Sequence, residues 1–472
     1  MIDAGFHPDF SSDVLSEIQG LKGRPATVGQ TLVRDLRQLL WSSIDNDTSR
    51  DLDQVEFAEK LADGTIRLLV GIADVDWLVT KGSATDRRAA SETTSVYTGV
   101  RTFPMLPVEL STDLTSLSES QERLGVVIEL RIVGSGEVVC HDVYRAWTLN
   151  HAKLTYSGTG AWLEGRGPMP EPVSKTPGLE EQLRLQLETS ERLRTIRKQR
   201  GMLSFGSVEA APVIDHDQIK DLAVRKHNVA EDIIESFMVA ANIAMAKFLK
   251  EKHSLCIRRV VKTPKRWDRI QAIAAQYGVK LPDAPDTRAL SDFLDKRKAA
   301  DPVHFPDLSL SVVKLLGPGE YVVEAPGAEH EGHFGIAAHD YTHSTAPNRR
   351  YADLVTQRLL KAASGADGAG YPEVELSQIA AHCTEREDAA RKVERLMRKV
   401  IAANLLSKRI GEIFDSIVTG ASPKGTYVRL LTFPAEGKVV RGAQGIDVGD
   451  KVKVRLVSVE VDQGFIDFEK VM

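Results

Sequence analysis

Four aspartates within nine positions constrain this chain more than any other feature of its sequence. Asp45, Asp47, Asp51 and Asp53 crowd the segment between residues 42 and 54. Carboxylates spaced this closely repel one another unless a divalent cation lies among them, and dense oxygen ligands suit Mg²⁺, Mn²⁺ or Ca²⁺ rather than zinc. The segment therefore predicts a metal site near the N-terminus. The plainer alternative is an acidic loop exposed to solvent.

A calcium-binding EF-hand loop is a second alternative. Counted from Asp45, oxygen-bearing side chains fall at loop positions 1, 3, 5, 7 and 9, and Glu56 stands at position 12. Position 6 is Arg50, whereas the sharp turn of such a loop requires glycine. The apolar run 66–73 also predicts a buried strand where a second helix should follow. The EF-hand is therefore only a minor alternative.

Length and composition limit the remaining possibilities. A chain of 472 residues is expected to form two or three domains with a sizeable core. No apolar run approaches a membrane span, and the first residues do not resemble a signal peptide. The three cysteines lie far apart, which suggests neither a zinc knuckle nor a disulfide framework. We expect a cytoplasmic protein with no membrane partner.

Charge is distributed unevenly along the chain. The formal net charge is −5, yet lysines and arginines gather in 391–409 and again in 424–455. Basic patches on an acidic chain are consistent with a polyanion bound on one face. Ordinary solvated side chains explain the charge equally well.

The order of patterns predicts an α+β fold. Strand-like runs in the first part, such as 126–133 and 137–139, give way to long amphipathic helices. We expect a mixed domain, β-rich at first and helical later, followed by a small five-stranded OB β-barrel. Helices are predicted over 31–41, 180–199, 231–252 and 377–408, a small-residue surface loop over 364–370, and the barrel strands over 412–418, 426–431, 438–441, 451–459 and 464–468. Tyr427 and Phe414 of the barrel are candidates for base stacking or for core packing.

A second polar cluster surrounds an arginine pair. Arg349 and Arg350 follow Pro347, and the apolar pattern after them predicts that they lie in the first turn of a helix. Two cations at the positive end of a helix dipole are unfavourable unless an anion such as phosphate binds. Solvated or ion-paired arginines are the alternative. The histidines nearby have no common zinc spacing: His330, His333, His339 and His343.

Taken together, these motifs resemble the ribonuclease II family of exoribonucleases, from about Leu36 to the C-terminus. The resemblance is carried by 44–54, 95–97 with 104–107, 152–156, 341–353 and 393–395. The tail resembles the family's C-terminal RNA-binding OB module, of the type named after a ribosomal protein. The domains are then expected to be a short helical segment 1–41 without cold-shock OB domains, an exoribonuclease catalytic domain 42–409 and an OB domain 410–472.

The resemblance implies Mg²⁺-dependent hydrolysis of single-stranded RNA from its 3′ end to nucleoside 5′-monophosphates. We expect a monomer. Two ions about 3.5–4 Å apart would serve, with Mn²⁺ as a possible substitute. The implied catalytic residues are Asp53, Arg349, Tyr97 and Glu394. The implied metal ligands are Asp45, Asp51, Asp53 and the neutral Gln54. The implied RNA contacts are Tyr97, Tyr156, Arg349, Arg350, Glu394 and Tyr427.

Some positions depart from the family pattern. Gln54 stands where the family has a fourth aspartate, and Ala346 and Asn348 replace a serine and an aliphatic residue. We hypothesise that Asp47 restores the charge lost at Gln54; the alternative is that it faces solvent or caps a turn. A family member that binds RNA without cutting it is the competing function.

Overall fold

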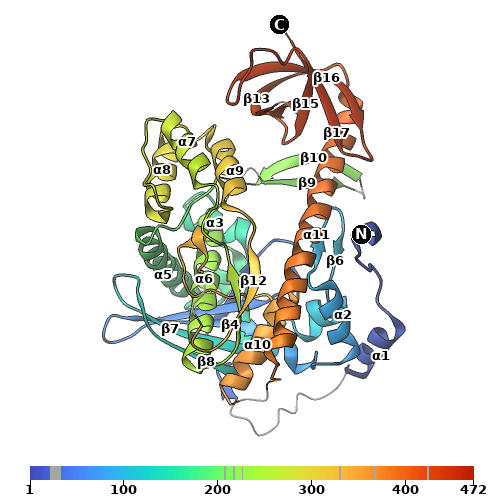
Figure 1. Ribbon diagram of the computed structural model, residues 1–472. Helices are drawn as coiled ribbons and strands as arrows, with labels where there is room; N and C mark the ends of the chain where they lie inside the picture. Colours follow the sequence, from blue (N-terminus) through green and yellow to red (C-terminus); the bar gives the residue numbers. More distant parts are fainter. Residues whose placement is uncertain are drawn as a thin grey trace.

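The computed structural model describes residues 1–21, 33–206, 209–215, 218–225, 227–328, 331–365, 368, 370–422 and 425–471. A large α+β body carries the long helix α11 (Glu373–Leu406), which runs up to a small barrel at the C-terminus (Figure 1). Within the described parts of the chain, no helix has both the length and the apolar character needed to cross a membrane.

A mixed six-stranded sheet forms the centre of the body. Its order is β1-β8-β2-β3-β4-β7, and β8 pairs with β7 as well. The strands are β1 (Arg34–Asp35), β2 (Trp41–Asp45), β3 (Gln54–Lys60), β4 (Ile66–Ala73), β7 (Glu122–Ile132) and β8 (Val138–Thr155). The predicted strand 66–73 is confirmed, because its apolar run lies in the middle of the sheet and is buried on both faces.

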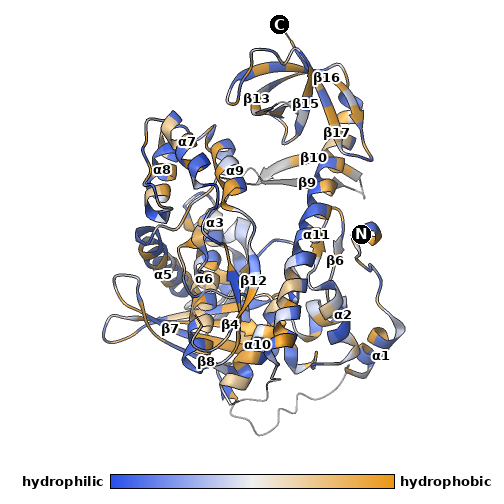
Figure 2. Cartoon of the chain, viewed as in Figure 1, coloured by the Kyte–Doolittle hydropathy of each residue, from blue (hydrophilic) through white to orange (hydrophobic). Residues whose placement is uncertain are grey.

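Two long helices, α5 and α6, pack on this sheet. Helix α5 spans Leu179–Gln199 and packs on β3, and α6 spans Val229–Glu251 and packs on β4, β7 and β8. Asn228 and Glu231 form a capping box that begins α6. Helix α10 (Tyr351–Ala363) is buried along most of its length, and Figure 2 shows hydrophobic and hydrophilic residues interspersed along α11. The helices predicted over 180–199, 231–252 and 377–408 are confirmed within a few residues of their ends.

Shorter elements complete the body. They are α1 (Ser12–Leu21), α2 (Ala84–Glu92), β5 (Val96–Tyr97), β6 (Thr102–Phe103), α3 (Tyr156–Leu163), α4 (Glu171–Lys175), β9 (Glu209–Asp215), β10 (Gln218–Arg225), β11 (Cys256–Val260) and β12 (Glu320–Glu324). Three further helices enclose a small core of their own: α7 (Trp267–Gln276), α8 (Thr287–Ala300) and α9 (Phe305–Leu316).

The helix predicted over 31–41 is wrong for the residues that the structure describes. Residues 31 and 32 lie outside them, and 33–41 form β1, a turn and the start of β2. Trp41 is fully buried in β2, and its indole Nε1 donates to the Leu36 carbonyl at 2.8 Å. The leucines of this stretch pack on the core from an irregular segment, so their helical spacing is coincidental. The N-terminal helix is α1 instead.

The C-terminal tail forms a closed five-stranded barrel, as predicted. Its order is β13-β14-β15-β17-β16, with bounds Ile413–Ser422, Gly425–Leu430, Glu436–Arg441, Lys451–Glu460 and Phe465–Lys470. The barrel core includes Ala403 and Leu406 from the end of α11, so helix and barrel share apolar contacts. Part of the predicted loop 364–370 lies outside the described residues.

Candidate active site

The acidic segment forms a loop between β2 and β3. The EF-hand alternative is therefore wrong, because strands and not helices flank the loop. Ser116 fixes it at two points: its hydroxyl donates to the Arg50 carbonyl at 2.8 Å and accepts from the Leu52 amide at 3.0 Å. Leu52 is buried, which turns its neighbours Asp51 and Asp53 away from it. Packing thus places the aspartates at one end of the sheet.

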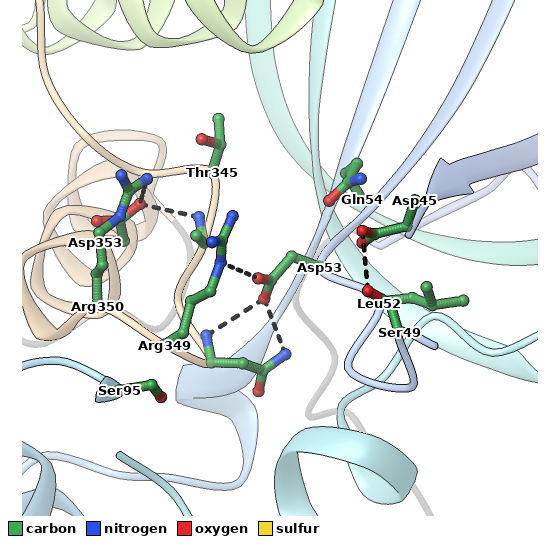
Figure 3. A network of polar contacts seen from close by, with 12 residues as sticks. Asp45, Ser49, Leu52, Asp53, Gln54, Ser95, Thr345, Arg349, Arg350 and Asp353 are labelled. Atoms are coloured by element: carbon green, nitrogen blue, oxygen red, sulfur yellow. Dashed lines mark hydrogen bonds and ion pairs between the residues drawn. The ribbon is translucent and has the colours of Figure 1, made fainter. Parts of the chain in front are cut away.

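Asp53 lies at the centre of a polar network (Figure 3). Its carboxylate accepts hydrogen bonds from the Asn348 amide at 3.3 Å and from Asn348 Nδ2 at 3.0 Å. The other oxygen pairs with Arg349 Nε at 3.3 Å. Asp53 is only 2% exposed. Its hydrogen-bond partners come from a segment almost three hundred residues away in the chain.

The electrostatics of the loop favour a cation. Burial raises the pKa of Asp53 to about 7. The charge of Arg349 opposes this shift only in part, and the negative charge of Asp51 adds to it. Burial also raises the pKa of Asp51. Carboxyl groups with raised pKa values are short of positive charge, and a divalent ion would supply it.

Asp45 and Gln54 stand on the other side of this loop (Figure 3). Asp45 ends β2, and its carboxylate accepts from the Asn46 amide at 2.6 Å and from Ser49 Oγ at 3.0 Å. Gln54 begins β3, is 6% exposed, and donates to the Ile44 carbonyl at 3.4 Å. The side-chain oxygen of Gln54 is thus available as a neutral ligand.

A further carboxylate, Glu56, is buried in β3 two residues beyond Gln54. It is 0% exposed, and neither side-chain oxygen has a hydrogen-bond partner. Burial raises the pKa of Glu56 well above its ordinary value, and the Asp45 charge adds to this. The sequence interpretation gave Glu56 no role outside the EF-hand alternative.

The arginine pair divides between two environments. Helix α10 begins at Tyr351, so the prediction that both arginines lie in its first turn is wrong: Arg350 is the N-cap and Arg349 lies in the turn before it. Arg350 pairs with Asp353 at 2.7 Å, which neutralises it at the helix start. Arg349 points to Asp53 and stays about half exposed (Figure 3).

Backbone pairing brings Tyr97 to the same place. The segment before β5 joins the arginine segment through the Ser95 amide, which donates to the Arg349 carbonyl at 3.0 Å. Tyr97 is 41% exposed. Partial burial raises the pKa of its hydroxyl to about 12, and the negative charges of Asp51 and Asp53 add to this shift. Glu394 on α11 accepts the backbone amide of Tyr97 at 2.9 Å. Three distant segments thus meet around Asp53.

The remaining predicted residues lie at different distances from this centre. Tyr156 begins α3, is half-buried, and burial with the nearby charges of Asp45 and Glu56 raises its pKa. Tyr427 lies on the barrel and is 38% exposed, so a stacking role is open to it, whereas Phe414 is part of the barrel core. Asn348, which the sequence interpretation treated only as a departure, is a direct partner of Asp53 and accepts from Thr115 Oγ1 at 2.6 Å.

Another group of possible ligands lies outside this site. His227, Asp232 and Glu235 have donor atoms within 4.8 Å of one another, the one such group among the described residues. Arg194 already forms an ion pair with Asp232, and His227 hydrogen-bonds the same carboxylate at 2.7 Å. These partners account for the group without a metal.

Comparison with known proteins agrees with this geometry. The RNB domain profile matches residues 33–365, which include every predicted site residue except Glu394 and Tyr427. The chain belongs to the RNB family. The profile of the RNase II-type exonuclease C-terminal S1 domain matches 412–471, which covers the barrel of this RNB-family chain. The expected resemblance to ribonuclease II-type exoribonucleases and the expected fold class are confirmed.

Curated relatives and solved structures support the assignment. Ribonuclease R 2 of Lactococcus lactis subsp. lactis is 29% identical over 98% of this chain and 73% of the relative. Ribonuclease R of Escherichia coli is 28% identical over 96% of this chain, but the chain spans only 59% of that relative. Mycoplasma genitalium RNase R in complex with ribose methylated single-stranded RNA matches with a TM-score of 0.88 at 23% identity, over 100% of this chain and 77% of that one.

The same fold occurs in a protein described as a pseudonuclease. The structure of yeast Ssd1 matches with a TM-score of 0.69 at 17% identity, over 90% of this chain and 52% of that one. Activity must therefore be argued from the residues of the site.

Proposed function

We propose that this RNB-family chain is an active, divalent-metal-dependent exoribonuclease that hydrolyses single-stranded RNA from its 3′ end and releases nucleoside 5′-monophosphates. One observation carries the proposal. Asp53, in the acidic loop, is buried in contact with Arg349, and Tyr97 stands beside both. The direction of attack and the products come from the family resemblance.

The donor set suits magnesium or manganese. Asp45, Asp51, Asp53 and Gln54 offer oxygen atoms only, as hard cations require. The raised pKa values of Asp51 and Asp53 support a cation at this place, because Arg349 opposes only part of the shift. When bound, one or two such ions would supply activation of the attacking water and stabilisation of the leaving 3′-oxygen.

The protein's own side chains would bind and orient the RNA end. The half-exposed guanidinium of Arg349 can hold a phosphate with two parallel hydrogen bonds while its Nε stays on Asp53. The exposed ring of Tyr97 offers a stacking surface for the terminal base. Glu394 fixes the backbone beneath that ring. Tyr156 would line the path of the strand, and Tyr427 would contact RNA farther along.

A 5′-labelled single-stranded RNA tests the proposal directly. With the protein and Mg²⁺, we expect a ladder of products shortened stepwise from the 3′ end, together with nucleoside 5′-monophosphates. A chelator should stop the reaction, and Mn²⁺ should restore it. An RNA that is bound but stays intact with either metal would contradict the proposal.

Gln54 favours one competing function, that of an RNA-binding protein with weak or no activity. It removes one negative charge from a site that must hold up to two divalent ions. The same labelled RNA separates the two functions, because a binding protein would shift the RNA in a gel without shortening it. A monomeric state, a cytoplasmic location and the three domain boundaries stay predictions, which light scattering, cell fractionation and limited proteolysis would test.

A further inference from the structure

Glu56 is a buried carboxylate that the structure leaves without any protein partner. It is 0% exposed, and both of its oxygens lack a hydrogen bond. In the described chain, no ion pair joins it to a lysine, arginine or histidine. A buried acid without partners is unfavourable in a folded protein, so each such group calls for a physical explanation.

The position of Glu56 in β3 points to an explanation. Side chains two residues apart on a strand share one face, so Glu56 lies on the same face as Gln54. Ser42 of β2 is the cross-strand neighbour of Glu56, so Glu56 lies where β2 and β3 pair, two residues into β3 from Gln54. Asp45 is close enough for its charge to act on Glu56, and Tyr156 experiences both charges. Glu56 therefore lies on the face of β3 that carries Gln54, within range of the charge of Asp45.

We propose that Glu56 is a carboxylate of the divalent cation site in this chain, and that it supplies the negative charge absent from Gln54. The inference rests on the metal-dependent function proposed above. A cation beside Asp45, Gln54 and Glu56 would provide the partner that both Glu56 oxygens lack, directly or through one bound water. The site would then carry as many carboxylates as one with aspartate at position 54.

Asp47 is the other candidate for this compensation, and the structure does not favour it. Its side chain is exposed, and its carboxylate accepts from Ser157 Oγ at 2.6 Å. It thus already has a protein partner and full access to water. Glu56 has neither.

Titration of Mn²⁺ into the full-length protein by calorimetry, without RNA, tests the role of Glu56. Glu56→Gln should weaken Mn²⁺ binding by about tenfold or more, as loss of a group supporting a metal does. Glu59→Gln is the matched control: it removes the same charge from the same strand, but Glu59 is more exposed and pairs with Arg67. It should change the affinity by less than about twofold.

A double variant keeps the test decisive if Glu56→Gln folds poorly. Gln54→Asp combined with Glu56→Gln moves the carboxylate back to position 54 and should recover most of the lost Mn²⁺ affinity. Unchanged affinity in a folded Glu56→Gln protein would overturn the role of Glu56, as would failure of the double variant to bind better than Glu56→Gln. If the wild-type protein binds no Mn²⁺ at all, the proposed metal-dependent function itself fails.

Discussion

At the scale of single residues, Asp53 combines two demands that oppose each other. It is buried where a charge is unfavourable, yet its neighbours Asn348 and Arg349 donate hydrogen bonds that only an acceptor can use. The result is a carboxyl with a pKa of about 7 in the absence of a cation. Such a group binds a metal readily near neutral pH, because it releases its proton there.

Asp53→Asn should therefore abolish cleavage while RNA binding survives. The amide keeps the shape of the side chain but supplies no charge to the metal, so single-turnover rates should fall by more than about a hundredfold. The variant should bind RNA at least as tightly as the wild type, since it repels phosphate less. Rates from quenched-flow assays and affinities from filter binding would be compared. Near wild-type release of monophosphates would remove Asp53 from the catalytic role.

The same substitution should reveal the raised pKa through stability. The folded-state pKa lies above the ordinary value of 3.8, so the folded protein keeps a proton that the unfolded chain releases. Stability contributed by this group therefore falls as the pH rises from about 4 to about 7. Asp53→Asn removes this dependence, and above pH 7 it should gain up to roughly 4 kcal/mol relative to the wild type. Urea unfolding with chelator at about pH 5 and about pH 8 measures the difference. The same difference in unfolding free energy between variant and wild type at both pH values would refute the raised pKa of Asp53.

The arginines should differ sharply when each is changed to lysine. An ammonium cannot reproduce the fork of a guanidinium, so Arg349→Lys should slow cleavage on the order of a hundredfold. Arg350 is engaged with Asp353, and Arg350→Lys should lower stability more than the rate of the chemical step. Parallel measurement of single-turnover rates and melting temperatures separates the two effects. Reversed effects would exchange the roles of Arg349 and Arg350.

At the scale of elements, α11 positions the stacking residue. Glu394 holds the backbone amide of Tyr97, so the helix and the β5–β6 hairpin are joined directly beside the site. Glu394→Ala removes the acceptor, and Glu394→Gln keeps one. We expect the alanine variant to raise KM for short RNA several-fold and the glutamine variant to stay near the wild type. Equal impairment of both would indicate that the charge of Glu394 acts on the RNA instead.

The elements also show which patterns a sequence interpretation can use. The run 66–73 was predicted correctly, because a short continuous apolar stretch is typical of a strand that is buried on both faces of a sheet. The spacing of the leucines in 31–41 allowed two outcomes, and contacts with Trp41 and the core decided between them. Glu56 was missed because polar residues alternate with Val55 and Phe57, a pattern typical of a strand with one solvated face. In the fold, α5 packs on β3, and Glu56 is buried although its place in the alternating pattern suggests exposure to solvent.

At the scale of the whole molecule, the site is an assembly of segments far apart in the chain. Asp53 and Asn348 are 295 residues apart, and Tyr97 and Glu394 are 297 apart. Periodicity and charge could identify the acidic loop and the arginine pair separately. Only the family resemblance placed them in one site, because local patterns carry no information on such long-range contacts. The hydrogen bonds of Asn348 are specific to this fold and had no signal in the sequence.

Helix α11 holds the barrel to the body, and an ion pair between β14 and α9 adds to this attachment. Arg429 of β14 donates from Nε at 3.3 Å and from a terminal nitrogen at 3.0 Å to Asp307 in the first turn of α9. Both side chains are mostly buried, so loss of either partner should loosen the barrel. A loosened barrel should shorten processive runs on long RNA while single-turnover cleavage of a short oligonucleotide stays unchanged.

Three variants decide whether this contact acts through docking of the barrel. Arg429→Ala and Asp307→Ala should shorten processive runs to the same extent, and the double variant should be no worse than either single variant. Product lengths under trap conditions on a long labelled RNA measure the runs. If Arg429 instead held RNA, Asp307→Ala would free its guanidinium and lengthen the runs, because basic side chains on a single-strand-binding barrel strengthen its grip on the backbone. Opposite effects of the two single variants would therefore assign Arg429 to the RNA and not to the interface.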